Sequence, residues 1–241
     1  MKSLSPAFAG LLYFYSLMRM TLTLCAALLC LSGHAQRSLA SAQWSLSTGT
    51  SNHVGELASM DGLLQEVRPV VQTSLTYFKG PRWGYGIHAS YGQLFADNVN
   101  YGQSEFTGIQ IRTNYVETHA RLTYHLNKYG QYWMRNPNTF YIFGDAGLLM
   151  SASQYMDDVS YPMDVEINEG TNYSPTYGGG FGWKLRHNHH WHTTLEYSFW
   201  SVPGDRLEGF TWTGAENGLK GPAADGLFSL SAGVTYTFYT W

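Results

Sequence analysis

Charged and titratable side chains recur at every second position of residues 114–127, NYVETHARLTYHLN. Glu117, His119 and Arg121 alternate there with apolar residues. In an enclosed structure such charges are expected to pair, because an unpaired charge at low dielectric is costly. We therefore predict an interior polar plug, with a narrow proton or ion path as the alternative. Its residues are Glu117, His119, Arg121, Asp145, Lys184 and Glu196, with His125 and His192 on the same inward face.

A second group of possible ligands is the run HNHHWH, which contains His187, His189, His190 and His192. His190 and His192 have the i, i+2 spacing that places two side chains on one face of a strand. The run contains no carboxylate or cysteine to complete a metal site. We interpret it as a solvated turn and predict no metal and no cofactor.

Two further patterns resemble ligand sites but lack the required spacing. The acidic residues Asp157, Asp158, Asp164, Glu166 and Glu169 could offer oxygens to calcium, yet they match no EF-hand loop. A solvated external loop is the interpretation we prefer. The glycines at 178, 179, 180 and 182 are not followed by GK[ST] and are therefore no phosphate loop. We expect them to make room for bulky interior neighbours.

The alternation at 114–127 identifies the element that positions the ionic residues. Successive side chains of a strand point to opposite faces, so this segment has one apolar face and one ionic face. It is longer than the usual soluble strand of about 5 or 6 residues. A long strand of this kind is typical of a membrane β-barrel, with lipid outside and polar groups inside.

Similar segments recur along the chain, with turns or loops between them. We predict eight strands and an all-β, eight-stranded antiparallel up-and-down transmembrane barrel. An open sheet would leave unpaired backbone groups in lipid, so the last strand is expected to pair with the first. The predicted strands are 43–50, 67–78, 83–94, 114–127, 139–151, 176–186, 191–201 and 226–239.

The connections alternate between long and short, which is the pattern of outer-membrane barrels with short periplasmic turns and longer external loops. This pattern predicts a bacterial outer-membrane protein with both termini in the periplasm. A soluble lipocalin-like barrel is the alternative, but its interior would be apolar and its exterior polar. The charged residues, 13% of the chain, are also fewer than the average of about 25%. A net charge of −3 without a basic stripe argues against nucleic acid as a partner.

The N-terminal residues 1–35 are predicted to be a signal peptide, and 36–241 the barrel. A basic residue, Arg19, precedes a short apolar run that ends in Gly33-His34-Ala35. Met18 or Met20 would then be the initiator of a shorter chain; an uncleaved anchor is the alternative. Both cysteines, Cys25 and Cys30, lie in this segment, so the mature barrel would have none.

One pair of residues could support an enzyme. His88 and Ser90 share a strand face, and some outer-membrane lipid A deacylases use a His-x-Ser pair with a glutamate. That chemistry needs a lipid-facing pair, whereas the lipid-facing parity here belongs to Tyr85, Ile87 and Ala89. We therefore predict no enzyme, with lipid A modification as a minor alternative.

The segments 49–57 (GTSNHVGEL), 67–69, 91–92 and 139–147 (TFYIFGDAG) resemble the small outer-membrane barrels typified by PorG. The resemblance covers about residues 43–238 and consists of glycines and aromatics at strand positions. It implies a scaffold or anchor of the type IX secretion and gliding apparatus, beside the periplasmic PorK–PorN ring. The alternative is a passive barrel that binds envelope material or external ligands through its loops.

Basic residues fall in or beside the three short turns, which makes these turns cationic. We expect them to contact an acidic periplasmic partner, because complementary charge favours association. The expected contact residues are Lys79, Arg82, Lys128, Arg135 and Arg186. Outer-membrane lipid is the other expected partner.

Overall fold

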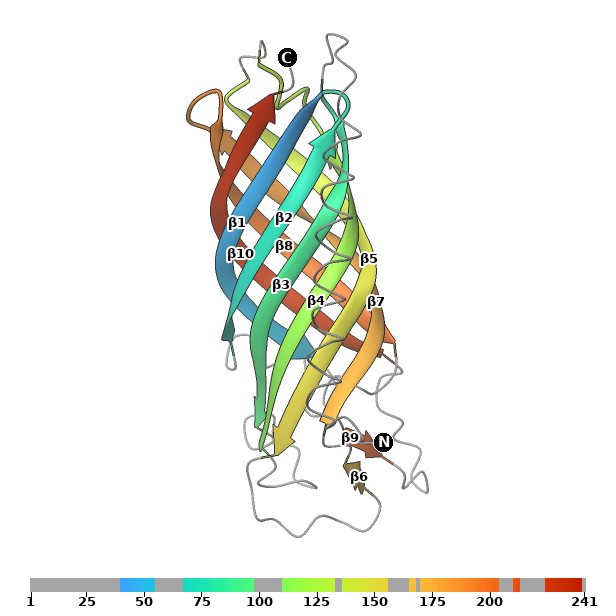
Figure 1. Ribbon diagram of the computed structural model, residues 1–241. Helices are drawn as coiled ribbons and strands as arrows, with labels where there is room; N and C mark the ends of the chain where they lie inside the picture. The colour runs from blue at the N-terminus through green and yellow to red at the C-terminus, as the bar shows by residue number, and fades with distance from the viewer. Residues whose placement is uncertain are drawn as a thin grey trace, which may run out of the picture. The chain divides into compact units, whose positions relative to one another are not determined.

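The structure, a computed structural model, describes residues 40–54, 67–97, 110–132, 136–155, 165–167, 170–203, 210–212 and 224–239. Eight strands form a closed antiparallel barrel in the order β1-β10-β8-β7-β5-β4-β3-β2 (Figure 1). The barrel strands are β1 (Ser41–Val54), β2 (Arg68–Phe78), β3 (Trp83–Asp97), β4 (Gln110–His125), β5 (Asn138–Tyr155), β7 (Gly170–Arg186), β8 (Trp191–Pro203) and β10 (Ala224–Tyr239). The predicted eight-stranded up-and-down barrel is confirmed.

The barrel closes between its first and last strands. β1 pairs with β10 along its whole length, from Ser41 opposite Tyr239 to Val54 opposite Gly226. No sheet edge of the barrel is therefore left open, as a lipid environment requires. In the described part of the chain, no helix has the length and apolar character needed to cross a membrane.

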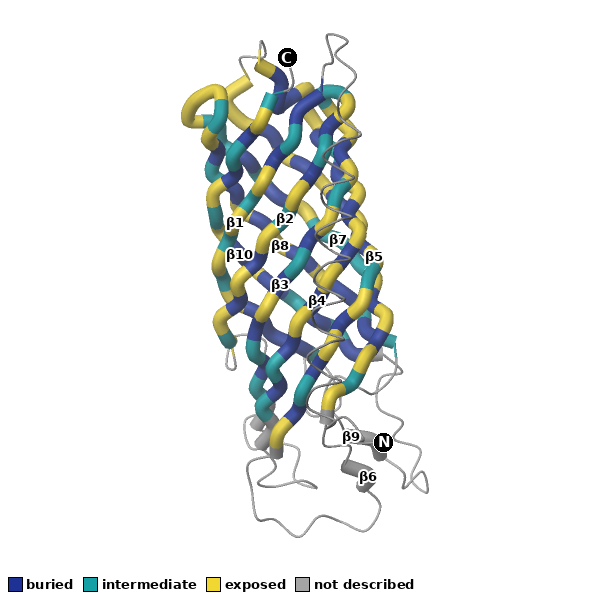
Figure 2. Tube along the Cα trace, viewed as in Figure 1, coloured by how far each residue is buried: buried dark blue, intermediate teal, exposed yellow. Residues whose placement is uncertain are grey.

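Exposed and buried side chains alternate along the barrel strands (Figure 2). On β3, Trp83, Ile87 and Tyr91 are 58–60% exposed, whereas His88 and Ser90 between them are buried. From Trp83 to Tyr91 the strand runs about 26 Å at about 3.3 Å per residue. Tilted strands of this length carry an apolar band close to the roughly 25 Å of outer-membrane barrels. Aromatic residues near both ends of the band match the girdles of such barrels.

The strands extend further than predicted, mainly on the side of the long loops. β1 continues to Val54 and β5 to Tyr155, and β7 begins at Gly170 and not at Thr176. Pro175 explains the late start predicted for β7, because proline is normally rare within a sheet. In the structure it pairs with Leu148 inside the strand.

A second, small sheet was not predicted from the sequence. β6 (Val165–Ile167) pairs antiparallel with β9 (Phe210–Trp212). It connects the β5–β7 loop with the β8–β10 loop, both of which were predicted to lack strands. Strands of three residues are too short to show a periodic pattern. The predicted signal peptide lies outside the described residues.

Candidate functional site

Arg121 on β4 is the charged centre of the barrel interior. It lies opposite Asp145 of β5, and its Nε and Nη2 donate hydrogen bonds to that carboxylate at 3.0 and 2.8 Å. Its Nη1 donates across the barrel to the two carboxylate oxygens of Glu196 on β8, at 2.8 and 3.0 Å. The Tyr141 hydroxyl also donates to Glu196, at 2.8 Å. One guanidinium therefore holds two carboxylates, and all three charged side chains are buried.

Glycines on the neighbouring strands give these large side chains their space. Gly86 lies opposite Arg121, and Gly182 lies opposite both Tyr141 and Glu196. A Cβ added at Gly182 would lie 2.3 Å from the Tyr141 ring. Arg121 also stacks on Phe143, with 3.9 Å between its guanidinium carbon and the ring centre. The interpretation of the β7 glycines as space for bulky interior groups is confirmed for Gly180 and Gly182, next to the rings of Phe143 and Tyr141, whereas an added Cβ at Gly179 would meet only backbone atoms.

A second polar cluster surrounds Glu117, four residues before Arg121 on the same face of β4. Ser90 donates a short hydrogen bond to Oε1 of Glu117. The other oxygen, Oε2, lies 3.8 Å from Nε2 of His119, and that nitrogen shares a 2.7 Å hydrogen bond with Thr176. Glu117 and His119 are both 1% exposed. Among the described residues, Glu117 has no salt bridge to Lys or Arg.

His88 and Ser90, the pair considered for lipid chemistry, both point into the barrel. They are 2% and 4% exposed, and Ser90 is bonded to Glu117 and not to His88. The His88 ring stacks beside those of His119 and Trp200, at centroid distances of 6.0 and 5.9 Å, and the latter two rings lie 5.4 Å from each other. The arrangement gives neither a His–Ser couple nor access from the lipid-facing surface.

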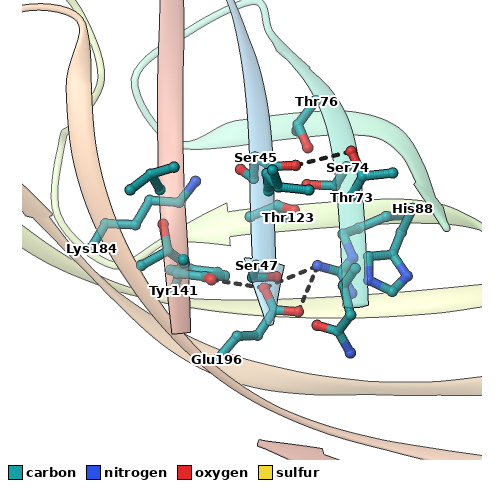
Figure 3. A pocket seen from close by; sticks show the side chains of 16 residues that line it. Ser45, Ser47, Thr73, Ser74, Thr76, His88, Thr123, Tyr141, Lys184 and Glu196 are labelled. Carbon is teal, nitrogen blue, oxygen red and sulfur yellow. Dashed lines mark hydrogen bonds and ion pairs between the residues drawn. The ribbon is translucent and has the colours of Figure 1, made fainter. Parts of the chain in front are cut away.

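The remaining cation of the predicted plug, Lys184, lies nearer the short turns. Its Nζ donates to Oε1 of Gln43 at 2.7 Å and lies 4.9 Å from the centre of the Tyr141 ring. Beside it, a cavity of about 20 Å³ is lined by His88, Arg121, Tyr141, Lys184 and Glu196, among others (Figure 3). A cavity of that size holds about one water molecule. It is far smaller than the roughly 300–1,000 Å³ of a small-molecule site.

The turn between β4 and β5 closes the interior at the end with the short turns. Tyr129 of this turn is 1% exposed, and its hydroxyl shares a 2.8 Å hydrogen bond with Nδ1 of His192 on β8. Burial raises the pKa of the Tyr129 hydroxyl, so the group stays protonated. Gly130 follows with a φ of 79°, which lets the chain turn back. The sequence predicted a short turn here but not that its tyrosine would fill the barrel mouth.

An apolar cluster closes the interior at the opposite end, where the long loops begin. Its residues come from six strands and are at most 2% exposed. They are Val70, Leu94, Tyr115, Leu149, Trp200, Val202 and Leu227. The charged layer is thus enclosed between an apolar layer and the Tyr129 turn.

Most of the cationic residues predicted as a contact surface lie at the short-turn end. Lys79, Arg82 and Lys128 are exposed, and Arg186 is half-buried. Arg82 donates to the Tyr124 hydroxyl at 3.1 Å. Arg135 lies outside the described residues. The described residues of these turns include no Asp or Glu.

The histidines of HNHHWH do not converge. His192 faces the interior, while His187 is hydrogen-bonded to Thr193 and His190 to the backbone oxygen of Thr237. Arg186 lies 2.9 Å from Nδ1 of His189. The acidic residues at 157, 158, 164 and 169 lie outside the described part of the chain.

No protein-family model matches the chain, and no curated protein matches it at a significant level. Several solved structures do match. Neisserial surface protein A is 12% identical with a TM-score of 0.47, covering 83% of this chain and 98% of its own. A major outer membrane protein from Thermus thermophilus is 11% identical with a TM-score of 0.45, covering 85% and 100%. Ail of Yersinia pestis is 13% identical with a TM-score of 0.44, covering 82% and 99%. Similarity this low carries no conclusion about ligands, partners or activity.

Proposed function

We propose that this chain is a non-enzymatic barrel of the bacterial outer membrane, which anchors a partner through its cationic short-turn end. The observation that carries the proposal is the division of the molecule into a filled interior and a turn end with positive side chains. A filled interior supports neither transport nor substrate binding. A partner would then bind at one of the two ends of the barrel. At the short-turn end, the described residues include the exposed side chains of Lys79, Arg82 and Lys128.

The acidic residues of the chain are concentrated at the long-loop end, where Arg68, Arg112, Arg206 and Lys220 also occur in sequence. Apart from the interior residues Glu117, Asp145 and Glu196, every Asp and Glu lies in sequence at the ends of strands that meet the long loops, or in those loops. A partner at the turn end is therefore expected to be acidic, since complementary charge steers association. In the form implied by the resemblance to PorG, this partner is the PorK–PorN ring of a type IX secretion or gliding complex.

Charge reversal tests the anchoring role. We expect Lys79→Glu, Arg82→Glu and Lys128→Glu together to abolish co-purification of periplasmic partners from cross-linked detergent extracts. As the control, Gln154→Glu and Thr171→Glu add acidic groups to exposed positions at the opposite end. Heat-modifiable migration on gels shows whether each variant is folded. If a folded triple variant recovers its partners as well as wild type does, the anchoring role is rejected. If the recovered partners are proteins other than ring components, the assignment to a type IX complex is rejected.

Labelling in intact cells tests orientation. Lys128→Cys is expected to resist a membrane-impermeant maleimide, and Gln154→Cys to react with it, because short turns face the periplasm in outer-membrane barrels. Cell lysis should make both cysteines reactive. The opposite pattern in intact cells would invert the barrel and place the cationic turns outside.

The second candidate function is binding of a ligand through the long loops, and the acidic character of that end favours a cationic ligand. Under this alternative, the triple charge reversal of Lys79, Arg82 and Lys128 would leave ligand binding by the long loops unchanged. If the protein modified lipid A, deletion of its gene would change the lipid A mass spectrum. We expect no such change, because His88 and Ser90 face the barrel interior and not the lipid.

A further inference from the structure

Three buried side chains from consecutive strands converge inside the barrel in a way that the sequence analysis did not foresee. His88 of β3, His119 of β4 and Asp145 of β5 each offer a ligand atom, and these atoms lie within 4.8 Å of one another. The strand register causes the convergence, because His88 is directly opposite His119. Asp145 lies opposite Arg121, two residues further along the same face of β4.

His88 gives an independent reason to expect a ligand at this position. Its side chain is buried, yet neither Nδ1 nor Nε2 has a hydrogen-bond partner among the residues that the structure describes. A buried polar atom without a partner loses its hydration without compensation, so such atoms are rare in folded proteins. Within the described ranges of the chain, one ring nitrogen of His119 is bonded, to Thr176, and Nδ1 has no partner. An imidazole fixed by a hydrogen bond at one nitrogen is typical of metal-binding histidines.

We propose that His88, His119 and Asp145 bind one divalent transition-metal ion of the zinc class inside the barrel. Two imidazoles and one carboxylate form a ligand set that suits zinc, whereas calcium and magnesium prefer oxygen ligands alone. The ligand atoms of a tetrahedral zinc lie roughly 3.3 Å apart, given metal–ligand distances of about 2.0–2.1 Å. The three ligand atoms, now within 4.8 Å of one another, would have to move closer together to reach that spacing.

The surrounding charges are compatible with a bound cation. Arg121 opposes it, but its guanidinium is already shared between Asp145 and Glu196. Glu117, whose Oε2 is 3.8 Å from His119, has no Lys or Arg partner among the described residues. Asp145 is held in place by Arg121 and, at 3.3 Å, by the indole nitrogen of Trp200.

The closed ends of the barrel determine how the ion would enter. The apolar layer around Leu149 and Leu227 lies on one side of the charged layer, and the Tyr129 turn on the other. We therefore expect the metal to bind while the barrel is still forming and to exchange slowly once the barrel has closed. This property separates the interior site from exposed histidines, whose metal is removed quickly by a chelator.

The test is refolding of the full chain from urea into detergent micelles with zinc, followed by extended washing with a chelator. Elemental mass spectrometry should then find about one zinc per chain, as a tetrahedral site with slow exchange requires. Zinc added only after folding should be removed by the wash. A parallel refolding with cobalt should give the visible absorption of a tetrahedral Co²⁺ site, a readout that needs no variant.

Two variants locate the metal. His88→Asn should lower retained zinc to less than about a tenth of wild type, with gel migration showing that the barrel has folded. The control His187→Gln, His189→Gln and His190→Gln removes the exposed turn histidines and should leave retention unchanged. Loss of zinc in the control alone, or wild-type protein that retains no metal and shows no cobalt spectrum, overturns the proposal.

Discussion

At the scale of single residues, Arg121 determines whether the interior charges are compensated. Its guanidinium donates to Asp145 and Glu196, and both carboxylates lie where water cannot replace it. Removing one partner of a buried ion pair costs more than the pair contributes, because the remaining charge stays buried. The stability of the barrel therefore depends on this side chain more than on any of the exposed arginines at the turns.

The first prediction follows from that asymmetry. Arg121→Met should lower the free energy of unfolding by about 3–5 kcal/mol, measured by urea titration of the barrel in lipid vesicles. Adding Asp145→Asn and Glu196→Gln should recover part of the loss, since the uncompensated charges are then gone. Arg82→Met, the same change at an exposed turn residue, should cost less than about 1 kcal/mol. Equal effects of the two arginine substitutions would contradict the role of Arg121.

Sequence periodicity was sufficient to assign the interior face but not the contacts made there. The parity of β4 puts Glu117, His119 and Arg121 on one face, and the structure buries all three. The bond from Arg121 to Glu196 crosses the barrel, so it depends on strand tilt and stagger, which no single strand encodes. The proximity of His88 to His119 depends likewise on the register between two strands.

At the scale of elements, each barrel strand separates a lipid-facing row from an interior row. Ile87 lies midway between Trp83 and Tyr91 in the lipid-facing row of β3, and Leu126 lies just beyond the end of β4 at the short turns. Both side chains are exposed, at 59% and 49%. The two positions therefore differ mainly in their depth in the membrane, which makes them a matched pair for substitution.

Arginine substitutions at these two positions should have different effects. Ile87→Arg should lower the free energy of unfolding in vesicles by about 2–4 kcal/mol, and Leu126→Arg by about 1 kcal/mol or less, because the cost of a charge on the lipid face falls toward the interface. Tryptophan fluorescence during urea titration measures both. A barrel that tolerates Ile87→Arg as well as Leu126→Arg would not have its apolar row in hydrocarbon.

The β4–β5 turn makes its own prediction through Gly130. A side chain at a φ of 79° is strained, and an added Cβ would also lie 2.9 Å from Nε2 of Gln43. Gly130→Ala should therefore destabilise the barrel by about 1–2 kcal/mol. Gly80→Ala in the β2–β3 turn should change stability by less than about 0.5 kcal/mol, since no atom lies within 4 Å of its added Cβ. The urea unfolding midpoints of the two variants, measured side by side, test this difference. A similar shift in both would exclude strain at Gly130.

The strands themselves were predictable because alternation of apolar and polar residues persists through the membrane-facing region. It fades where strands leave that region, so the extension of β5 to Tyr155 and of β7 back to Gly170 was missed. Pro175 strengthened the error, since it resembles a loop residue although it pairs within β7. The inward turn at Tyr129 had only Gly130 as a signal, and a glycine in a turn does not show where the neighbouring side chain points.

At the scale of the whole barrel unit, the interior is closed in layers. The apolar cluster, the Arg121 layer and the Tyr129 turn follow one another along the barrel, and the cavity between them holds about one water molecule. A hydrated ion needs more space than this. The structure thus favours a filled plug over the narrow ion path that the sequence left open.

Electrical recording tests the closure of the barrel. The wild-type protein in planar lipid bilayers should give no regular conductance steps at high salt. Tyr129→Ala should also remain silent, because the apolar layer around Leu149 and Trp200 still blocks the opposite end. Uniform steps from the wild type, suppressed by Arg121→Glu, would show that ions do pass through the charged layer.

The pairing of β1 with β10 has a consequence for biosynthesis. The earliest barrel segment to leave the ribosome finds one of its two neighbours only in the last one, Ala224–Tyr239. A chain that lacks β10 would leave two unsatisfied edges, with no shorter cylinder to fall back on. Deletion of Ala224–Tyr239 should therefore be as damaging as deletion of the first barrel strand, Ser41–Val54.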